Sequence, residues 1–375
     1  MITNLRPVAT RHDVDLFLDL PRAIYRGDPA WVPPLLFDKR QQLAPSHPFF
    51  KHAEWQGWIA WDGDTPVGRI SAQVDRLNAD LGRPRLGYFG MLEAIEDGDA
   101  VRDLFTAAED WLRARGMDRV VGPFNLGINQ EVGLLVDGFA TRPFFMMGHA
   151  RPYYDGLVKR AGYVPAKDLL AYEVRPDFVA PKVMTAMQER LGPRMVIRPL
   201  DPKRRDAELE MLRDIFNDAW ADNWNFVPFT EEEFRTIGRE MLLLIGPEFI
   251  QIALVDDEPS AFIVMLPNLN EVIADIDGKL LPFGWARLLW RVKVKFPTTT
   301  RVPLMGVRRR HHHTRLGPAL AFGVIDAVRR AAIARGVKSV EMSWILEDNA
   351  GMRNIIETIG GTATKRYRMY EKALV

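Results

Sequence analysis

The residues best suited to chemistry lie in one short stretch of the C-terminal third of the chain. An apolar run ends at Gly306 and Val307 and continues as a basic loop, Arg308–Arg315, that contains four arginines and three histidines. Gly317-Pro318 closes the loop, and an apolar helical pattern begins there. Proline suits a first helical position because its missing N–H would have no partner. The amides of that turn, the helix dipole and the guanidinium groups all favour an anion. We therefore predict that this loop holds a phosphorylated cofactor.

A solvated charge run, or a contact with nucleic acid, is the alternative interpretation of the same residues. The loop joins two strongly apolar segments, which fixes both of its ends and favours the phosphate site. The chain has 50 Lys and Arg residues against 49 Asp and Glu, a formal net charge of +1. No global field therefore attracts nucleic acid, and we expect no nucleic-acid partner.

Composition excludes several other chemistries. The absence of cysteine rules out disulfides, thiolate catalysis and zinc–thiolate sites. The first residues lack the pattern of a signal peptide, and no apolar run is long enough to span a bilayer. A chain of 375 residues is comfortable for two domains. We expect a cytoplasmic protein with two domains.

The elements that position the basic loop belong to a faint internal repeat. Four matched pairs carry it, in the same order in both halves: Leu5–Val8 with Ile197–Leu200, Ile59-Ala60 with Ile252-Ala253, Arg115-Gly116 with Arg335-Gly336, and Tyr172-Glu173 with Tyr370-Glu371. Together with the hydrophobic periodicity they predict two copies of strand–helix–strand–strand–strand–helix–strand–helix–strand.

The repeat predicts an α/β (α+β) fold with two tandem domains, each a mixed, mainly antiparallel sheet flanked by helices. The first domain is expected over residues 1–175, a linker helix over 176–194, and the second domain over 195–375. An insertion at 122–145 distinguishes the first copy, and an insertion at 268–300 distinguishes the second.

This order of elements, with the motifs of the second copy, resembles the GNAT acyltransferase superfamily. In that family the loop amides bind the pyrophosphate of an acyl-coenzyme A, and the next strand splays away to admit the thioester and an acceptor amine. The family pattern Gln/Arg-x-x-Gly-x-Gly/Ala is matched by Thr314, Gly317 and Ala319 except at its first position. A tyrosine often seen on the last helix falls on Ile356. The resemblance implies acyl-CoA as co-substrate, bound by Gly306, Val307, Arg308, Arg309, Arg310, Thr314, Arg315, Gly317, Ala319 and Asn349.

The equivalent loop of the first copy, Glu93–Asp99, is acidic and would repel a pyrophosphate. We therefore expect residues 1–175 to form a non-catalytic copy that packs on the second. A first copy that is active with an uncharged ligand is the open alternative.

Amide formation from a thioester requires alignment, a stabilised oxyanion and removal of a proton from the amine. Backbone amides near Gly306 and Val307 are suited to the oxyanion. The candidates for proton transfer are Glu347, Asp348, Glu131, Tyr370 and His311. The segment Glu347-Asp348-Asn349 is equally suited to cap the last helix, and the sequence does not choose among these groups. No dedicated metal site is expected from the three histidines.

The whole chain resembles a family of tandem-GNAT proteins that includes the bacterial ceramide synthases. The segments that carry this resemblance are Asp28–Pro34, Pro48–Phe50, Gly122–Asn125, Gly133–Phe139, Pro152–Tyr154, Phe216–Trp220 and Asn223-Trp224. It implies transfer of a fatty acyl group to a sphingoid-base amine, in sphingolipid biosynthesis. Three alternatives stay open: an acetyl-CoA-dependent N-acetyltransferase of a small amine or peptide, an aminoacyl-transfer-RNA-dependent peptide ligase, and a non-catalytic GNAT-fold binding protein.

Each insertion has two interpretations. The first, 122–145, either lines the acceptor pocket or packs between the halves. Within the second, residues 280–296 combine tryptophans with Lys and Arg. Such a segment lies either in a membrane interface, on the inner face of the cytoplasmic membrane, or in the core with its basic stems covering apolar surface. The sequence does not indicate an oligomeric state.

Overall fold

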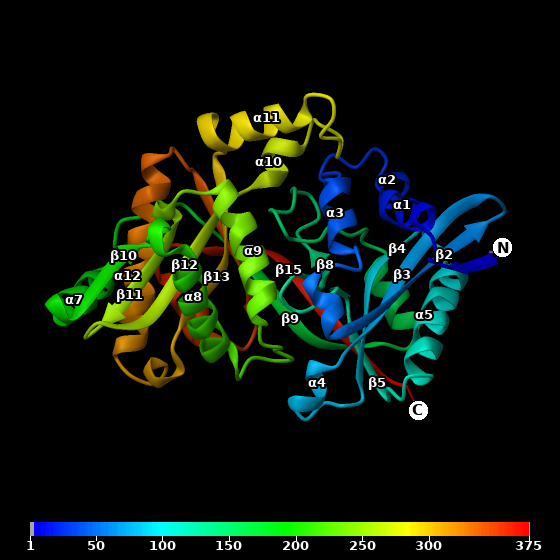
Figure 1. Cartoon of the computed structure of the whole chain (residues 1–375), viewed down its shortest axis with the longest axis horizontal. Helices are drawn as coiled ribbons and strands as arrows, with labels where there is room; N and C mark the ends of the chain where they lie inside the picture. Colours follow the sequence, from blue (N-terminus) through cyan, green and yellow to red (C-terminus); the bar gives the residue numbers. More distant parts are fainter. Residues whose placement is uncertain (1–3, 375) are drawn as a thin grey trace. The chain divides into compact units, whose positions relative to one another are not determined.

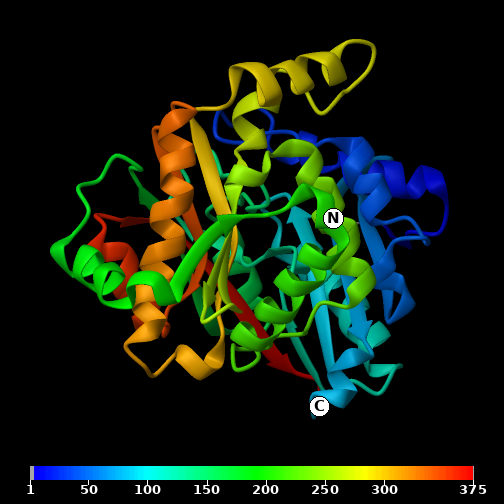
Figure 2. The ribbon, with the colours of Figure 1, turned by 60° about the vertical axis from the view of Figure 1, so that its left-hand side comes forward.

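The computed structural model describes residues 4–374 and contains two compact units, each built from segments distant in sequence (Figures 1 and 2). Unit 1 holds the chain up to Leu169, Ile273–Gly284 and the chain from Lys365 onward. Unit 2 holds Leu170–Val272 and Trp285–Thr364. Each unit is a mixed, mainly antiparallel sheet flanked by helices, which confirms the predicted fold class. The predicted boundaries at 175 and 195 divide the chain by repeat, and they stay a prediction.

The sheet of unit 1 has the strand order β1-β2-β3-β4-β5-β15. Its strands are β1 (Asn4–Pro7), β2 (Ala53–Asp62), β3 (Thr65–Asp75), β4 (Leu86–Ala94), β5 (Arg119–Gly122) and β15 (Thr362–Ala373), with β8 (Leu134–Asp137) on β15 and a separate hairpin of β6 (Phe124–Asn125) and β7 (Glu131–Val132). Its helices are α1 (Arg11–Asp19), α2 (Pro21–Ile24), α3 (Leu36–Gln42), α4 (Leu77–Asp80), α5 (Gly98–Arg113) and α6 (Tyr154–Arg160). The amphipathic α5 buries Leu104 and Leu112 completely.

The sheet of unit 2 has the order β9-β14-β13-β12-β11-β10. Its strands are β9 (Val164–Val174), β10 (Met195–Pro199), β11 (Ile250–Val255), β12 (Glu258–Pro267), β13 (Thr299–Val307) and β14 (Ser339–Leu346). Its helices are α7 (Lys182–Leu191), α8 (Arg205–Trp220), α9 (Glu231–Leu244), α12 (Leu316–Ala334) and α13 (Ala350–Thr358); α10 (Leu269–Ile273) and α11 (Gly284–Trp290) belong to the insertion. Helices α8 and α12 both pack on β12 and β13.

The final strand of each sequence half lies in a sheet formed mainly by the other half. Strand β15, from the end of the chain, pairs antiparallel with β5 through Tyr370–Ala373 and Gly122–Arg119. Strand β9, from the first half, is the neighbour of β14. The repeat therefore predicts both strands correctly, but it does not reveal that they are exchanged.

Helix α12 begins at Leu316, two residues before the predicted start at Pro318. The helix starts two residues earlier because the Thr314 hydroxyl accepts the Leu316 N–H at 3.1 Å and the Gly317 N–H donates to the Thr314 carbonyl at 3.3 Å. Pro318 then occupies the third helical position, where a missing N–H still leaves no intrahelical bond unmade. None of the helices within residues 4–374 is long and apolar enough to cross a membrane.

Candidate functional site

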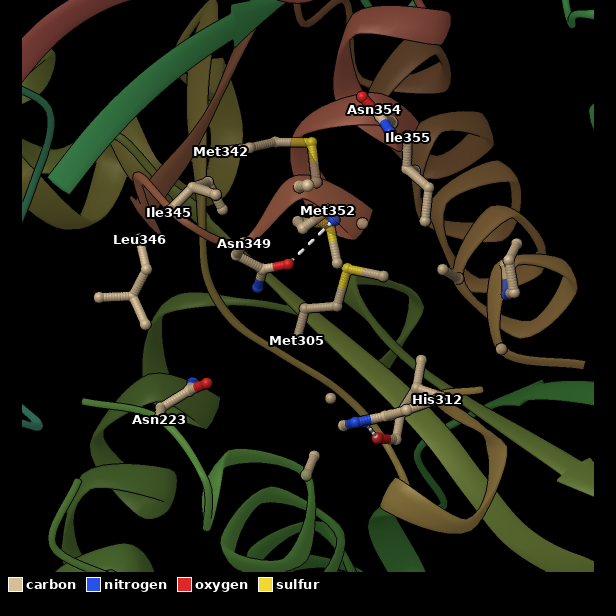
Figure 3. Close-up of a pocket in the computed structure, with 18 of the residues that line it drawn as sticks. Asn223, Met305, His312, Met342, Ile345, Leu346, Asn349, Met352, Asn354 and Ile355 are labelled. Atoms are coloured by element: carbon tan, nitrogen blue, oxygen red, sulfur yellow. Dashed lines mark hydrogen bonds between the residues drawn. The ribbon is translucent and has the colours of Figure 1, made fainter. Parts of the chain in front are cut away.

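Strands β13 and β14 lie side by side only over their first residues. Parallel pairing joins Thr299–Val302 to Ser339–Met342 and then stops. Beyond that point β13 follows β12 as far as Val307, while β14 continues to Leu346 without pairing to β13. The two strands thus diverge, and a cavity of about 870 Å³ lies in unit 2 where they separate (Figure 3).

The open edge of β13 presents backbone donors to this gap. Antiparallel residues alternate between facing the partner strand and facing away. The Arg308 N–H donates to the Ser260 carbonyl at 2.9 Å, so in this register Gly306 also faces β12, while Met305 and Val307 face the gap. Their carbonyl groups confirm this direction, because Met305 O accepts from the Trp220 indole at 2.9 Å and Val307 O accepts from His312 Nε2 at 2.6 Å. Of the two amides predicted for the oxyanion, only that of Val307 lies on the open edge.

The predicted loop glycines are required by close packing. A Cβ on Gly306 would lie 3.1 Å from the Cβ of Ala219 on α8, and a Cβ on Gly317 would lie 2.6 Å from the His311 carbonyl oxygen. Gly317 therefore lets the first turn of α12 fold back against the loop, with Ala319 buried behind it. Within residues 4–374 no acceptor is hydrogen-bonded to the backbone N–H of His313 or Arg315. These two donors lie where the loop meets the helix N-terminus, and His313 lines the cavity.

The three consecutive arginines are held by carboxylates and do not line the cavity. Arg308 pairs with Asp214 at 2.5 Å, and Arg309 pairs with Asp218 at 3.4 Å and with Asp222 at 3.2 Å. These acids, spaced four residues apart, form one stripe along and just beyond α8. Arg310 pairs with Glu258, the first residue of β12, at 2.7 Å. No such pair is found for Arg315 in the part of the chain that the structure describes.

Helix α13 supplies another wall. The Asn349 side chain caps it by accepting the Met352 N–H at 3.0 Å (Figure 3). Asn349 and Asp348 line the cavity, whereas Glu347 does not. The Arg353 guanidinium donates to the Glu347 carbonyl oxygen at 2.8 Å. Ile356, at the position of the family tyrosine, is completely buried.

Much of the remaining lining is apolar. Three methionines from three different elements surround the same space: Met305 of β13, Met342 of β14 and Met352 of α13 (Figure 3). Ile345, Leu346 and Ile355 extend this surface. Unbranched thioether side chains adapt to irregular or flexible apolar groups. One end of the cavity therefore favours an anion, and its interior favours a hydrocarbon chain.

The chain is similar over almost its full length to two curated proteins. A protein named bacterial ceramide synthase from Caulobacter vibrioides (strain NA1000 / CB15N) is 45% identical over 371 residues, which cover 98% of this chain and 97% of the relative. Protein YghO from Escherichia coli (strain K12) is 43% identical over 371 residues, which cover 99% and 95%. This chain belongs to their family. No family profile matches the sequence.

Solved structures with a similar fold identify the fold of this chain. A tandem GNAT protein from the clavulanic acid biosynthesis pathway has a TM-score of 0.56 at 13% identity and covers 99% of both chains. A GCN5-related N-acetyltransferase from Sphaerobacter thermophilus has a TM-score of 0.55 at 13% identity and covers 100% of this chain and 97% of its own. The chain thus has the tandem GNAT fold. The diverging pair β13 and β14 is the splayed pair that the resemblance implied.

Besides Glu347, the other three predicted catalytic groups outside the cavity lining are His311, Tyr370 and Glu131. His311 is buried, accepts from Arg310 Nε at 3.1 Å and has its pKa lowered by burial and by Arg310. Tyr370, in unit 1, donates to Asp155, and burial together with that bond raises its pKa far above the usual value. Burial acts to raise the pKa of Glu131, also in unit 1, but the Lys39 ammonium at 2.6 Å, together with Asn125 and Arg69, holds that pKa below the usual range. Their roles stay predictions.

Other residues that line the cavity were not predicted as site residues. Trp220, Asn223 and Trp224 come from the end of α8 and the turn after it, and Ser343 and Trp344 from β14. The first three fall in segments that carried the ceramide-synthase resemblance, so a signal for them was present. Among the described residues, no group of three His, Cys, Asp or Glu side chains is placed to hold a metal ion.

Unit 1 contains the same strand divergence, but it is filled. Strands β4 and β5 pair only over Leu86–Tyr88 and Arg119–Val121. The first insertion enters beyond that point: a Cβ on Gly90 would lie 1.8 Å from the Phe124 carbonyl oxygen, and Asn125 Oδ1 accepts the Met91 N–H at 2.8 Å. Phe124 and Leu126 are almost completely buried. The insertion thus closes the gap of its own unit.

The helix start of unit 1 is also occupied. Asp97 caps α5, its carboxylate accepting the N–H groups of Asp99 at 2.8 Å and Ala100 at 3.0 Å. Glu93, at the end of β4, accepts from the hydroxyls of Tyr25 at 2.7 Å and Tyr154 at 2.9 Å. Burial raises the pKa of Glu93 to about 7, against the opposing effects of Arg69 and the two hydroxyls.

Proposed function

We propose that this GNAT protein transfers a fatty acyl group from acyl-coenzyme A to the amine of a sphingoid base, forming a ceramide-type amide. The observation that carries the proposal is the cavity between β13 and β14, with an anion-favouring loop at one end and a methionine-rich interior. The 45% identity to a protein named bacterial ceramide synthase supports the choice of acyl donor and acceptor.

The pyrophosphate is assigned to the amides of His313 and Arg315 and to the N-terminus of α12. Both N–H groups need an acceptor, and the helix end favours negative charge. Arg315, free of any ion pair within residues 4–374, supplies the cation. Arg308, Arg309 and Arg310 act in this proposal by fixing the loop to α8 and β12, because their charges are already matched by carboxylates.

The acyl chain is assigned to the surface formed by Met305, Met342 and Met352. The thioester carbonyl then lies at the open edge of β13, where the amides of Met305 and Val307 can donate to the developing oxyanion. Such donors act most strongly when water is excluded, which an acyl chain bound along the apolar part of the lining would favour. Asp348 and Asn349 lie at the α13 end of the same cavity.

Unit 1 is assigned a non-catalytic role. Its strand divergence is filled by Phe124–Leu126, and the Asp97 carboxylate occupies the helix end that a phosphate would need. An uncharged ligand would meet the same filled gap, which argues against the alternative of a second active copy.

The second insertion is assigned to a membrane surface. Six of its large apolar side chains are about half or more exposed: Leu281, Phe283, Trp285, Leu289, Trp290 and Val294. Exposed Arg287, Lys293 and Lys295 lie among them, and residues 278–298 contain no Asp or Glu. Basic and aromatic residues together favour an anionic lipid interface. Val292 and Phe296 are buried and anchor the segment.

The function is tested by measuring coenzyme A release from acetyl- and palmitoyl-coenzyme A, with and without sphinganine. Turnover that requires both palmitoyl-coenzyme A and sphinganine is the expected result. Turnover with acetyl-coenzyme A and small amines alone would replace the substrate assignment. Binding without any turnover would indicate a non-catalytic GNAT protein, and no binding would contradict the cofactor site.

Membrane contact is tested by co-sedimentation with phosphatidylglycerol and phosphatidylcholine vesicles. We expect binding to the anionic vesicles, and loss of binding in the double variant Trp285→Ala/Trp290→Ala. Phe37→Ala is the matched control, because Phe37 is a similarly exposed aromatic residue (59%) outside the segment. Equal loss in both variants would contradict the assignment.

A further inference from the structure

A buried ion pair lies where β13 and β14 separate. Arg301 of β13 and Glu341 of β14 are partners in the parallel ladder, one residue before its last pair. Arg301 is 3% exposed and Glu341 is fully buried. Removing two charges from water is costly, so a buried ion pair is a poor source of stability compared with apolar packing. Because this pair lies next to the point where the strands separate to form the cavity, its contacts point to a role in function.

Ser343 connects this pair to the cavity. It lies on the same face of β14 as Glu341, just past the last paired residue, and it lines the cavity. Its Oγ donates to Glu341 Oε1 at 2.6 Å and accepts from Arg301 Nε at 2.8 Å. A hydroxyl offers one donor and two acceptor lone pairs. One lone pair of Ser343 is therefore left for a donor inside the cavity.

The two walls of the cavity carry complementary groups. The amides of Met305 and Val307 face it from β13 and suit an oxygen that gains negative charge. Ser343 faces it from β14 and suits an N–H that must lose a proton. A thioester held between the strands would have its carbonyl oxygen toward β13 and the attacking amine toward β14.

We propose that Ser343 and Glu341 form a proton relay for the acceptor amine, an assignment that rests on the acyl-transfer function proposed above. The ammonium acceptor gives one proton to Ser343 Oγ as Ser343 gives its own to Glu341 Oε1, which leaves a neutral amine and a protonated Glu341. The nitrogen lone pair then attacks the thioester carbon. The C–S bond breaks with its electron pair on sulfur, and the second nitrogen proton neutralises the thiolate. Glu341 later returns its proton to solvent. Arg301 is the positioning residue that orients Ser343 and Glu341.

Two other polar groups of the cavity, His312 and Asp348, are less suited to this task. His312 donates its Nε2 proton to the Val307 carbonyl, and its side chain is exposed. Asp348 is also exposed, so water competes for its oxygens. By contrast, Ser343 is a buried residue (4% exposed), and its hydroxyl proton has a defined route into a buried carboxylate.

Comparing two acceptor amines, sphinganine and hydroxylamine, distinguishes a proton relay from a purely structural role of Ser343 and Glu341. Sphinganine is largely an ammonium ion at pH 7 and must lose a proton, whereas hydroxylamine is largely neutral. For Ser343→Ala and Glu341→Gln we expect kcat/KM with sphinganine to fall about 100-fold, the scale of general-base catalysis, and kcat/KM with hydroxylamine to change less than about 3-fold. Raising the pH should partly restore the sphinganine rate, because more acceptor is then already neutral.

Ser339→Ala is the matched control. Ser339 lies on the same strand and donates to the Glu173 carboxylate at 2.9 Å, but it does not line the cavity. Ser339→Ala should change kcat/KM by less than about 3-fold with either acceptor amine. Ser343→Thr, which keeps a hydroxyl, should retain most of the activity with both. If Glu341→Gln does not fold, the relay is tested by Ser343→Ala and Ser343→Thr alone.

Different results would contradict the acyl-transfer function and the proton relay. A wild-type protein that turns over neither acceptor would overturn the acyl-transfer function and the relay together. A wild-type protein that turns over both, with Ser343→Ala losing the same factor for each, would overturn the relay alone.

Discussion

The two units contain the same diverging strand pair with opposite outcomes. In unit 1 the pairing of β4 and β5 stops at Tyr88 and Val121, and Phe124–Leu126 fills the space beyond. In unit 2 the pairing of β13 and β14 stops at Val302 and Met342, and a cavity of about 870 Å³ is left. The strand order alone therefore does not make a site. A ligand can bind between the diverging strands only where no other segment of the chain fills the gap.

The helix that follows each gap shows the same contrast. The start of α5 is capped by the Asp97 carboxylate, which already supplies the negative charge that a helix end favours. The start of α12 has no side-chain cap at Arg315. A phosphate would compete with an internal carboxylate in unit 1 and would meet unpaired amides in unit 2.

The largest expected effect separates the two helix starts. Gly317→Ala places a Cβ 2.6 Å from the His311 carbonyl oxygen and must displace the loop, so affinity for coenzyme A should fall by at least about tenfold. Gly98→Ala, at the start of α5, meets nothing within 4 Å and should change neither affinity nor folding. Isothermal titration of both variants checks this. Equal affinities would place the cofactor elsewhere.

A second pair of variants distinguishes residues that stabilise the fold of unit 1 from residues that bind ligand in unit 2. Asn125→Ala leaves the buried Met91 N–H without its acceptor, and unfolding free energy should fall by about 1–3 kcal/mol while coenzyme A affinity stays unchanged. Asn223→Ala, in the cavity of unit 2, should weaken palmitoyl-coenzyme A binding and leave stability nearly unchanged. Urea denaturation and titration measure both. The opposite pattern would mean that the insertion of unit 1 contributes to the ligand site.

The pH dependence of stability tests the closed interior of unit 1. Because burial raises the pKa of Glu93 to about 7, the folded protein binds more protons than the unfolded chain between pH 4.5 and 7. Its stability should therefore fall as pH rises through that window, by on the order of 3 kcal/mol. Glu93→Gln should remove this component. The difference between wild type and variant in urea midpoints from pH 4.5 to 8 isolates it, with exposed Glu347→Gln as control; a constant difference would mean that Glu93 titrates normally.

The smallest expected effects compare two helix caps. Asp97→Ala and Asn349→Ala each remove a side chain that accepts N–H groups at a helix start, and each should cost about 1 kcal/mol of stability. Only Asn349→Ala should also weaken acyl-coenzyme A binding, because Asn349 lines the cavity. Thermal unfolding and titration check both variants. New coenzyme A binding in Asp97→Ala, at a second site, would show that the cap alone closes unit 1.

The structural features of the basic loop are predictable from the sequence because their determinants are local, whereas its binding role stays a prediction. The need for glycine at 317, the helix that follows it and the acidic counterpart at Glu93–Asp99 all depend on residues close together in the chain. The start of α12 was wrong by two residues because the Thr314 hydroxyl accepts the Leu316 N–H. The fold class was predictable because hydrophobic periodicity and the repeat point to the same elements.

What the sequence could not predict depends on contacts between distant segments. The stripe Asp214, Asp218 and Asp222 is visible in the sequence, but its pairing with Arg308 and Arg309 requires α8 to lie against the loop. Matching repeats predict β9 and β15 but not the exchange of their sheets. Glu341 lies in an apolar strand, and its link to Ser343 and Arg301 depends on strand register.

The stoichiometry of coenzyme A binding tests the contrast between the units most directly. Isothermal titration of the full chain with palmitoyl-coenzyme A should give one site per chain, and that site should be lost in Gly317→Ala and kept in Gly98→Ala. Two sites per chain would contradict the closed state of unit 1. Absence of binding would contradict the open cavity of unit 2 as the acyl-coenzyme A site.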